Sequence, residues 1–417
     1  MKRHFTKIVM TLVTLLSTPS TFAQTPDNVP SYFIANGTSP ALAESKTLAH
    51  LVFVSQAAGN NVTDIFHTAS GDAGKTWSTA VSISNTPGMS TEPSIAVESN
   101  GSLDAVWTDT STSDKTPDIF FARSTDNGKT WTQPKDIANT PGKSSDPKIV
   151  VGKNNSLHVV WCDTSKGTKN RDIYYSSSID GGEHWGKDPL LPATDISNTS
   201  GFSSKPTIAV DETGGVHVAW IDTTRSEDHP DVFYARTAGT SWTKPVDISF
   251  SVRKSIHASI ACSRGKTYLC WTDNSRKEFA ADVWLVISKS SETRFSKPEN
   301  ISNTPNISSQ PDAHASGPWL GIVWSDQSTA ADKPHIFARV SLDQGSDFSN
   351  VMDITTKSGA CIHPKSTFIG KRMVVVWQER SGDQETLKST SLRVDNIGTG
   401  PAMDVDPIIK GVSGNQH

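Results

Sequence analysis

The sequence has few cysteines, no excess of positive charge, and no long apolar segment beyond its first residues. Four cysteines among 417 residues are too few for a fold built on disulfides. After residue 24 no stretch is long and apolar enough to cross a membrane as a helix. The formal net charge of −4 argues against a nucleic-acid partner.

The one apolar segment stands at the N-terminus. Three basic residues flank the run IVMTLVTLL, and Thr21 and Ala23 occupy the −3 and −1 positions of a cleavage site. This pattern predicts a signal peptide over residues 1–23, which is too short to span a membrane. Its removal would take away three positive charges and move the formal net charge from −4 to −7. We therefore expect a secreted or periplasmic protein without a membrane span.

Two of the cysteines, Cys262 and Cys270, flank the turn-like segment SRGK. Export would permit a disulfide between them but would not require one. Alternatively, both replace core residues, because valines occupy the matching places in an earlier repeat. Cys162 and Cys361 stand in distant repeats, and we expect them to be unpaired.

What the sequence does have is a long internal repeat, rich in turn residues and tryptophan. An aromatic residue recurs in its middle at spacings of 51 to 59 residues, at Phe53, Trp107, Trp161, Trp220, Trp271, Trp324 and Trp377. A period near 50 residues indicates a β-propeller rather than a helical solenoid. Alternation and bounding turn residues predict four strands in one unit, at 93–97, 103–107, 118–124 and 131 to about 137.

Seven aromatic positions predict a single all-β propeller of seven four-stranded blades over residues 24–393. The last unit lacks a fourth strand, and Ile34-Ala35-Asn36 repeats the triplet Ile-Ala-Asn that opens at Ile137. We therefore expect residues 30–36 to supply the outer strand of the last blade and to close the ring. Residues 394–417 show no repeat pattern, and we expect an irregular C-terminal tail outside the blades.

A short string, S-x-D-x-G-x-x-W, falls on the predicted turn between the third and fourth strands. Asp there can bond local backbone and Gly tolerates a positive φ, while the aromatic residue is expected to begin the next strand and pack under the turn. The string predicts a structural turn. Its copies are Ser70, Asp72, Gly74 and Trp77; Ser124, Asp126, Gly128 and Trp131; Ser178, Asp180, Gly182 and Trp185; and Ser341, Asp343, Gly345 and Phe348.

This string is the Asp-box, and the chain resembles the sialidase-like propeller superfamily, also called the bacterial neuraminidase (BNR) repeat. The resemblance covers almost all of the mature chain. It implies that the substrate binds on the face opposite the boxes. Members with sialidase activity typically have six blades, which is the alternative to seven here. The resemblance also implies three substrate-binding arginines, a Tyr nucleophile helped by Glu, and an Asp acid/base. Here the Arg-Ile-Pro motif is missing and the last tyrosine, Tyr268, occupies a strand position, so no catalytic residue carries over.

One position in the repeat varies from copy to copy, although the residues around it follow the repeat pattern. The residue that precedes the proline (Ala258 in the fifth copy) at the start of each inner strand is polar in every copy: Ser39, Glu92, Asp146, Lys205, His257, Gln310 and His363. This pattern predicts side chains that face a central channel from seven sides. The two carboxylates, Glu92 and Asp146, are the catalytic candidates, and Lys205, His257, Gln310 and His363 are ligand-binding candidates.

The fifth copy of the repeat departs most from the others. It brings basic residues to the face opposite the boxes. Arg253, Arg276 and the neighbouring Arg225 are candidates for binding an acidic group, because Arg can hold a carboxylate with two hydrogen bonds. The alternative is an ordinary solvated loop surface.

The Asp residues that follow the mid-repeat aromatic in register are expected to cap turns. No loop has the spacing of a calcium cage, so we expect neither a metal nor another cofactor. The recurring residues are Asp109, Asp163, Asp222, Asp273 and Asp326.

Two functions fit these observations. The first is an exported, non-catalytic module that binds a glycan or another protein through the face opposite the boxes. We call this side the loop face, because the loops between blades and between the second and third strands emerge there. The second is a divergent glycoside hydrolase that uses Glu92 and Asp146. The sequence leaves open whether the protein is an enzyme.

Overall fold

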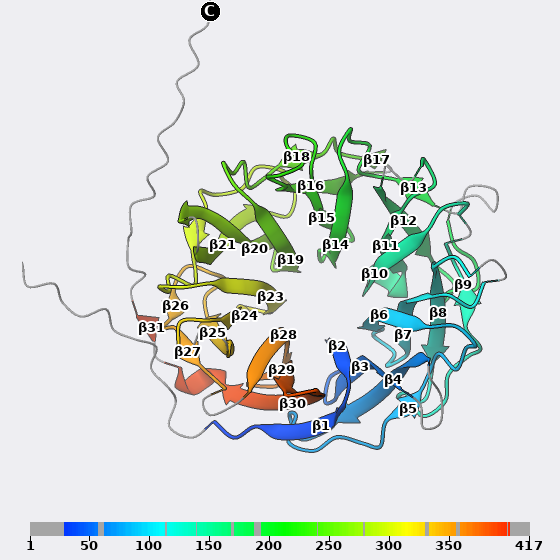
Figure 1. Ribbon diagram of the computed structural model, residues 1–417, viewed down its shortest axis with the longest axis horizontal. Coiled ribbons are helices and arrows are strands. Elements are labelled where there is room, and N and C mark those ends of the chain that lie inside the picture. The colour runs from blue at the N-terminus through cyan, green and yellow to red at the C-terminus, as the bar shows by residue number, and fades with distance from the viewer. Residues whose placement is uncertain are drawn as a thin grey trace, which may run out of the picture.

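Seven antiparallel sheets are arranged around a central axis in the computed structural model (Figure 1). The described residues are 29–56, 62–112, 115–138, 140–167, 171–186, 193–239, 241–277, 280–329, 333–355, 359–397 and 399–400. The expected signal peptide lies outside them. No helix in these ranges is long and apolar enough to cross a membrane.

Each blade contains four strands, and its first strand lies nearest the axis. Blade 1 contains β2 (Thr38–Glu44), β3 (Ala49–Gln56), β4 (Thr63–Ser70) and β5 (Val81–Ser82). Blade 2 contains β6 (Ser90–Val97), β7 (Leu103–Asp109), β8 (Asp118–Ser124) and β9 (Lys135–Asp136). Blade 3 contains β10 (Ser144–Val151), β11 (Leu157–Asp163), β12 (Asp172–Ser178) and β13 (Thr194–Asp195), with the short helix η1 (Lys153–Asn155) between its first two strands.

The remaining blades follow the same order. Blade 4 contains β14 (Ser203–Val210), β15 (Val216–Asp222), β16 (Asp231–Ala238) and β18 (Val246–Asp247), and β17 (Ser241–Trp242) also pairs with β16. Blade 5 contains β19 (Ser255–Ser263), β20 (Lys266–Lys277), β21 (Ala280–Lys289) and β22 (Glu299–Asn300). Blade 6 contains β23 (Ser308–Ser316), β24 (Trp319–Asp326), β25 (His335–Ser341) and β27 (Met352–Asp353). Blade 7 contains β28 (Ala360–Ile369), β29 (Arg372–Ser381), β30 (Gln384–Arg393) and β1 (Tyr32–Asn36).

The N-terminal strand closes the ring as the sequence predicts. β1 pairs antiparallel with β30, with Ala35 opposite Leu387. Ile34 packs in a core cluster with Leu387 and Phe53, which belong to blades 7 and 1. The prediction of seven blades with N-terminal closure is confirmed, and the six-blade alternative is wrong.

Two short elements follow Arg393: η2 (Val394–Asn396) comes directly after β30, and β31 (Thr399–Gly400) pairs with β26 (Phe348–Ser349) in a two-stranded sheet separate from the four-stranded blades. One local expectation needs correction. Trp131 does not begin the fourth strand, since β9 starts only at Lys135. The Trp131 indole N–H instead donates to the Gly128 carbonyl at 3.2 Å, which folds the chain back at this point.

The cysteines are all free thiols. In the β19–β20 ladder Cys262 stands opposite Thr267, and Cys270 stands opposite Ser259. The two thiols therefore do not face each other, and the disulfide alternative is wrong.

The hydrophobic core is divided among the seams between blades. One cluster joins Val52 and Ile65 of blade 1 to Leu103 and Trp107 of blade 2, and further clusters join other neighbouring pairs. The mid-repeat aromatic residues are at most 2% exposed at all seven positions, which are Phe53, Trp107, Trp161, Trp220, Trp271, Trp324 and Trp377. Burial of such large side chains makes these seams the main hydrophobic stabilisation of the fold.

The four boxes connect neighbouring blades at four of the seven seams, on the face where the third strands end. In the second copy the Ser124 hydroxyl donates to the Asp126 carboxylate at 2.8 Å, and the Gly128 N–H donates to Ser124 Oγ at 2.9 Å. The other three copies repeat both bonds. Hydrogen bonds from Thr130 and Ser124 lower the pKa of Asp126 to about 2. The box aspartate thus acts as a charged local cap on the surface.

The box glycine and tryptophan lie against the preceding blade. The Trp131 ring packs edge-on against His67 of blade 1, with ring centroids 5.5 Å apart. A Cβ on Gly128, which has a φ of +82°, would lie 2.1 Å from the same imidazole. Only glycine fits so close a contact at a positive φ. The box is therefore a connection between blades as well as a turn.

The seam between blades 1 and 2 contains a pair of buried histidines, which have no counterpart at the matching place in the seam between blades 2 and 3. His67 Nε2 lies 3.3 Å from Nδ1 of His50, and both side chains are buried. Burial lowers the pKa of His50 to about 4, and burial together with His50 lowers that of His67 to about 3. At the matching place in blade 2, Phe121 packs against Trp185 with no titratable group of its own.

The first prediction concerns ring closure. Deleting residues 24–36 would remove β1 and leave the backbone groups of β30 without partners. We expect this deletion to lower the melting temperature sharply and to cause aggregation, and deletion of residues 401–417 to change little. Thermal melting and light scattering on both variants make the comparison. An N-terminal deletion that melts like the parent would show that β1 does not close the ring.

The second prediction concerns acid stability. Because unfolded histidine titrates near pH 6.5, the unfolded state binds more protons than the folded state between that pH and the folded values of about 4 and about 3. Each histidine should therefore destabilise the protein by up to about 1.4 kcal/mol per pH unit as the pH falls through this window. We expect His67→Phe, which copies Phe121, to flatten this slope in denaturant unfolding at pH 4.5 to 7. An unchanged slope would contradict the assignment.

Candidate functional site

The seven variable positions share one unusual backbone conformation. The inner strand of every blade carries a register shift at this point, and each residue has a positive φ between 51° and 56°. A left-handed conformation is uncommon for residues other than glycine and is stabilised here by the surrounding sheet. The residues that adopt it are Ser39, Glu92, Asp146, Lys205, His257, Gln310 and His363.

The bulges bring all seven side chains to one cavity. The inner strands surround the centre of the ring (Figure 1), and a cavity of about 490 Å³ lies between them. All seven residues line it, as the sequence predicts. Because the first strand of each blade starts on the face opposite the box turns, the bulges lie on the loop face.

A second layer of residues lines the same cavity two positions further along each inner strand, and it is polar in every blade except blade 1, where the residue is Ala41. Lys365 Nζ lies 2.9 Å from the Asp312 carboxylate, and Lys148 Nζ donates to the Pro147 carbonyl at 3.0 Å. Burial lowers the pKa of Lys148, opposed by Asp146. Sequence reasoning missed this layer, because the bulge interrupts the simple alternation of side chains along each inner strand.

Blades 2, 3 and 4 contribute a compact cluster of charges. Lys205 Nζ lies 2.5 Å from Asp146 and 3.8 Å from Glu92, and the Asp146 N–H donates to Glu92 Oε2 at 2.8 Å. Arg171 donates to the second Asp146 oxygen at 2.9 Å. Burial alone would raise the pKa of Asp146, but the charge of Lys205 and hydrogen bonds hold it below its ordinary value. Asp146 is therefore ionised at neutral pH.

In the opposite part of the ring, the bulge residues His257, Gln310 and His363 are uncharged at neutral pH. Enclosure and the nearby charge of Lys365 lower the pKa of His363 to about 4, and enclosure lowers that of His257 as well. The Gln310 side-chain oxygen accepts a hydrogen bond from the backbone N–H of His363 at 2.9 Å. At neutral pH both imidazoles are neutral, so each offers one donor and one acceptor.

Two members of the predicted arginine cluster, Arg225 and Arg253, do not line the cavity. Arg225 lies on a loop outside it and contacts Asp231 and Asp247, at 3.1 Å each. Arg253 is half-buried in the loop before β19. Arg276 lies in β20, but its side chain is outside the described residues.

The recurring aspartates brace the loops around the cavity. Asp109 accepts hydrogen bonds from the Trp107 indole at 2.9 Å and from Ser90 at 2.7 Å, and its other oxygen accepts the Ser111 N–H at 2.8 Å. Blades 3, 4 and 6 repeat this arrangement. Among the described residues no group of three or more His, Cys, Asp and Glu side chains is placed to hold a metal ion.

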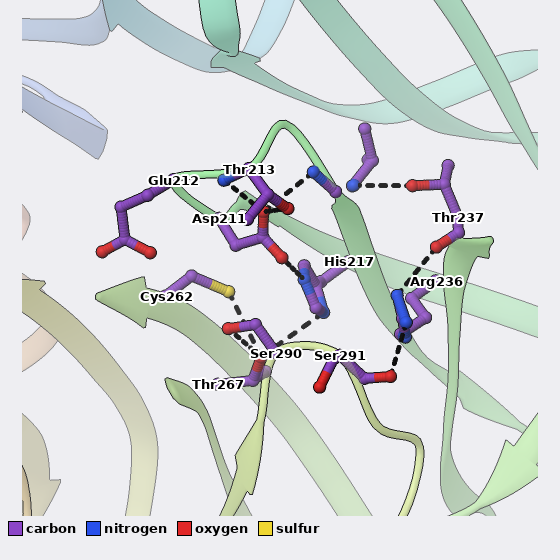
Figure 2. Close-up of polar contacts among 12 residues, drawn as sticks. Asp211, Glu212, Thr213, His217, Arg236, Thr237, Cys262, Thr267, Ser290 and Ser291 are labelled. Carbon is purple, nitrogen blue, oxygen red and sulfur yellow. Dashed lines mark hydrogen bonds and ion pairs between the residues drawn. The ribbon is translucent and has the colours of Figure 1, made fainter. Parts of the chain in front are cut away.

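A smaller cavity of about 260 Å³ lies between the inner turns of blades 3 and 4, and Cys262 lines it. Figure 2 shows the polar network beside it, in which Asp211 contacts His217 at 3.1 Å. Thr267 Oγ1 lies 3.4 Å from His217 Nδ1 and 3.5 Å from the Cys262 sulfur. Burial raises the pKa of Cys262 to about 12, so the thiol remains protonated. The network is a buried connection between blades and provides no nucleophile.

Comparison with known families agrees with this architecture. A profile of BNR repeat-like domains matches residues 101–385. The chain belongs to this BNR repeat-like family. No curated protein matches the sequence.

Solved structures show the same fold at low sequence identity. A Hadza microbial sialidase has a TM-score of 0.54 and 14% identity, over 87% of this chain and 66% of that chain, so this protein spans slightly under two thirds of it. An ulvan lyase bound to a saccharide of GlcA and Rha has a TM-score of 0.59 and 10% identity, over 86% and 95% of the two chains. An α-L-arabinanase from Penicillium chrysogenum, complexed with arabinobiose, has a TM-score of 0.52 and 12% identity, over 89% and 100%.

Proposed function

We propose that this BNR repeat-like propeller binds a saccharide at its loop-face cavity and does not cleave it. The observation that carries the proposal is the set of seven polar side chains, of six kinds, held by seven like bulges around one cavity. Strain repeated at seven positions indicates selection for the direction of the side chains, because a regular strand would point them elsewhere.

The mixture of groups matches a polyhydroxylated ligand better than a simple ion. Glu92 and Asp146 accept hydrogen bonds, Lys205 donates them, and His363 and Gln310 do both. Vicinal sugar hydroxyls also donate and accept, so one ring can satisfy both kinds of partner. A lone anion or cation would leave half of the cavity unmatched. The sialidase, the lyase and the arabinanase are named for action on saccharides, which supports the same ligand class.

The geometry gives less support to hydrolysis. A glycosidase needs one carboxyl group that is protonated and donates to the leaving oxygen. Asp146 is held ionised by Lys205 and Arg171. Glu92 Oε2 accepts hydrogen bonds from the Asp146 N–H and, at 3.0 Å, from the Thr108 hydroxyl. Asp146 is thus ionised and Glu92 Oε2 is occupied as an acceptor, so we assign both residues to ligand binding.

Export would place this binding outside the cytoplasm. The N-terminal pattern predicts a secreted or periplasmic protein. The cavity would then meet extracellular or cell-wall saccharides, with a protein partner as the remaining alternative for the loop face.

The third prediction tests binding directly. The mature chain is screened by affinity electrophoresis in gels with ulvan, linear arabinan, polygalacturonate or sialylated mucin. We expect retardation by at least one polysaccharide and a loss of about ten- to a hundredfold in affinity for Lys205→Ala, as for a lost charge-assisted hydrogen bond. Lys129→Ala, an exposed lysine on the box turn, is the matched control and should bind normally.

Two outcomes would contradict the proposal. Normal binding by the Lys205 variant would place the ligand elsewhere. Release of reducing ends by the parent, abolished by Glu92→Gln, would establish the hydrolase alternative. Retention of an uncleaved polysaccharide together with loss of binding in the Lys205 variant supports a binding module.

A further inference from the structure

The loop between blades 4 and 5 has an unusual residue at a turn position where three equivalent loops have asparagine. Asn85, Asn198 and Asn303 occupy the same place in three loops of the same type, with φ of 43°, 40° and 44°. Asparagine suits this left-handed conformation, because its short amide can bond local backbone. In the loop between blades 4 and 5 the residue is Phe250, with a φ of 41°. A bulky residue there is a conformational outlier.

Phe250 is also exposed, so packing does not explain it. Its side chain is 72% exposed, and Val252 two residues later is 79% exposed. Both the strained backbone and the solvent-exposed apolar side chain of this residue are unfavourable for stability. Unfavourable local features of this kind are most common at functional sites.

The ring is held in place by a fixed cation. The Arg225 guanidinium lies 4.2 Å from the centroid of the Phe250 ring. Arg225 is itself held by Asp231 and Asp247, at 3.1 Å each. Asp247 also accepts the Phe250 N–H at 2.9 Å. The aromatic surface is therefore preorganised before any ligand arrives.

A related pair links this loop type to the cavity. Arg171 lies 5.5 Å from the ring centroid of Phe202 in the loop between blades 3 and 4. The same guanidinium contacts Asp146, which lines the cavity. Arginine–phenylalanine pairs thus stand on two consecutive loops, and the first adjoins the cavity.

We propose that Phe250 and Arg225 form a second saccharide subsite, outside the cavity, for a further sugar ring of an extended polysaccharide. This inference rests on the proposed function. The C–H face of a sugar ring packs against the electron-rich face of an aromatic ring, while the guanidinium donates to hydroxyl or carboxylate oxygens. His257, which lines the cavity, follows Phe250 by seven residues, so the two lie at most about 25 Å apart. One polysaccharide chain can therefore occupy both.

The decisive variant is Phe250→Asn, which installs the residue that three other loops carry. Because it relieves the backbone, we expect an equal or higher melting temperature. Affinity for the retarding polysaccharide among ulvan, linear arabinan, polygalacturonate and sialylated mucin should fall about tenfold in affinity electrophoresis. Ile179→Ser, which removes an apolar side chain 88% exposed near the box turn, is the control and should bind normally.

The outcomes separate this inference from the function on which it rests. Loss of binding in the Phe250 variant with unchanged or higher stability supports the subsite. Normal binding by the Phe250 variant, while Lys205→Ala binds weakly, overturns the subsite and leaves the cavity as the binding site. A parent protein that none of the four polysaccharides retards overturns both.

Discussion

The pairing of β1 with β30 is the constraint on which the rest of the molecule depends. Ala35 opposite Leu387 joins strands from the two ends of the chain, and Ile34 completes the seam between blades 7 and 1. Because the core is divided among seams, an open seam would expose apolar surface and a free sheet edge together. The central cavity exists only when all seven inner strands surround it, so closure is also a condition of function.

The two faces of the ring differ in how closely their residues repeat. On the box face, the same serine, aspartate and glycine recur with the same hydrogen bonds, and each aromatic residue supports the preceding blade. On the loop face, the backbone bulge recurs but its side chain varies, with six kinds of polar residue among seven blades. Constant geometry with variable chemistry is the arrangement expected when a repeated scaffold presents one composite site.

Much of this could be predicted from the sequence, because it rests on periodicity. The seven blades, the closing strand and the seven bulge residues around the cavity all follow from aligning the repeats with one another. Contacts between repeats could not be read in this way: the packing of Trp131 on His67 and the charges that hold Asp146 ionised depend on distances between blades. The engagement of Arg225 by Asp231 and Asp247 depends on the loop conformation within blade 4. Phe250 did leave a signal, a phenylalanine where three loops have asparagine, but its meaning required the backbone angle.

The central claim is that ligand binding belongs to the loop face and the boxes to the framework. Hydrogen–deuterium exchange, with and without the polysaccharide that binds most tightly, tests it most directly. The account predicts slower exchange on binding in the loops at residues 85–92, 198–205 and 250–257, and no change in the box turn at 124–131. Protection of the box turn with unchanged loops would contradict it.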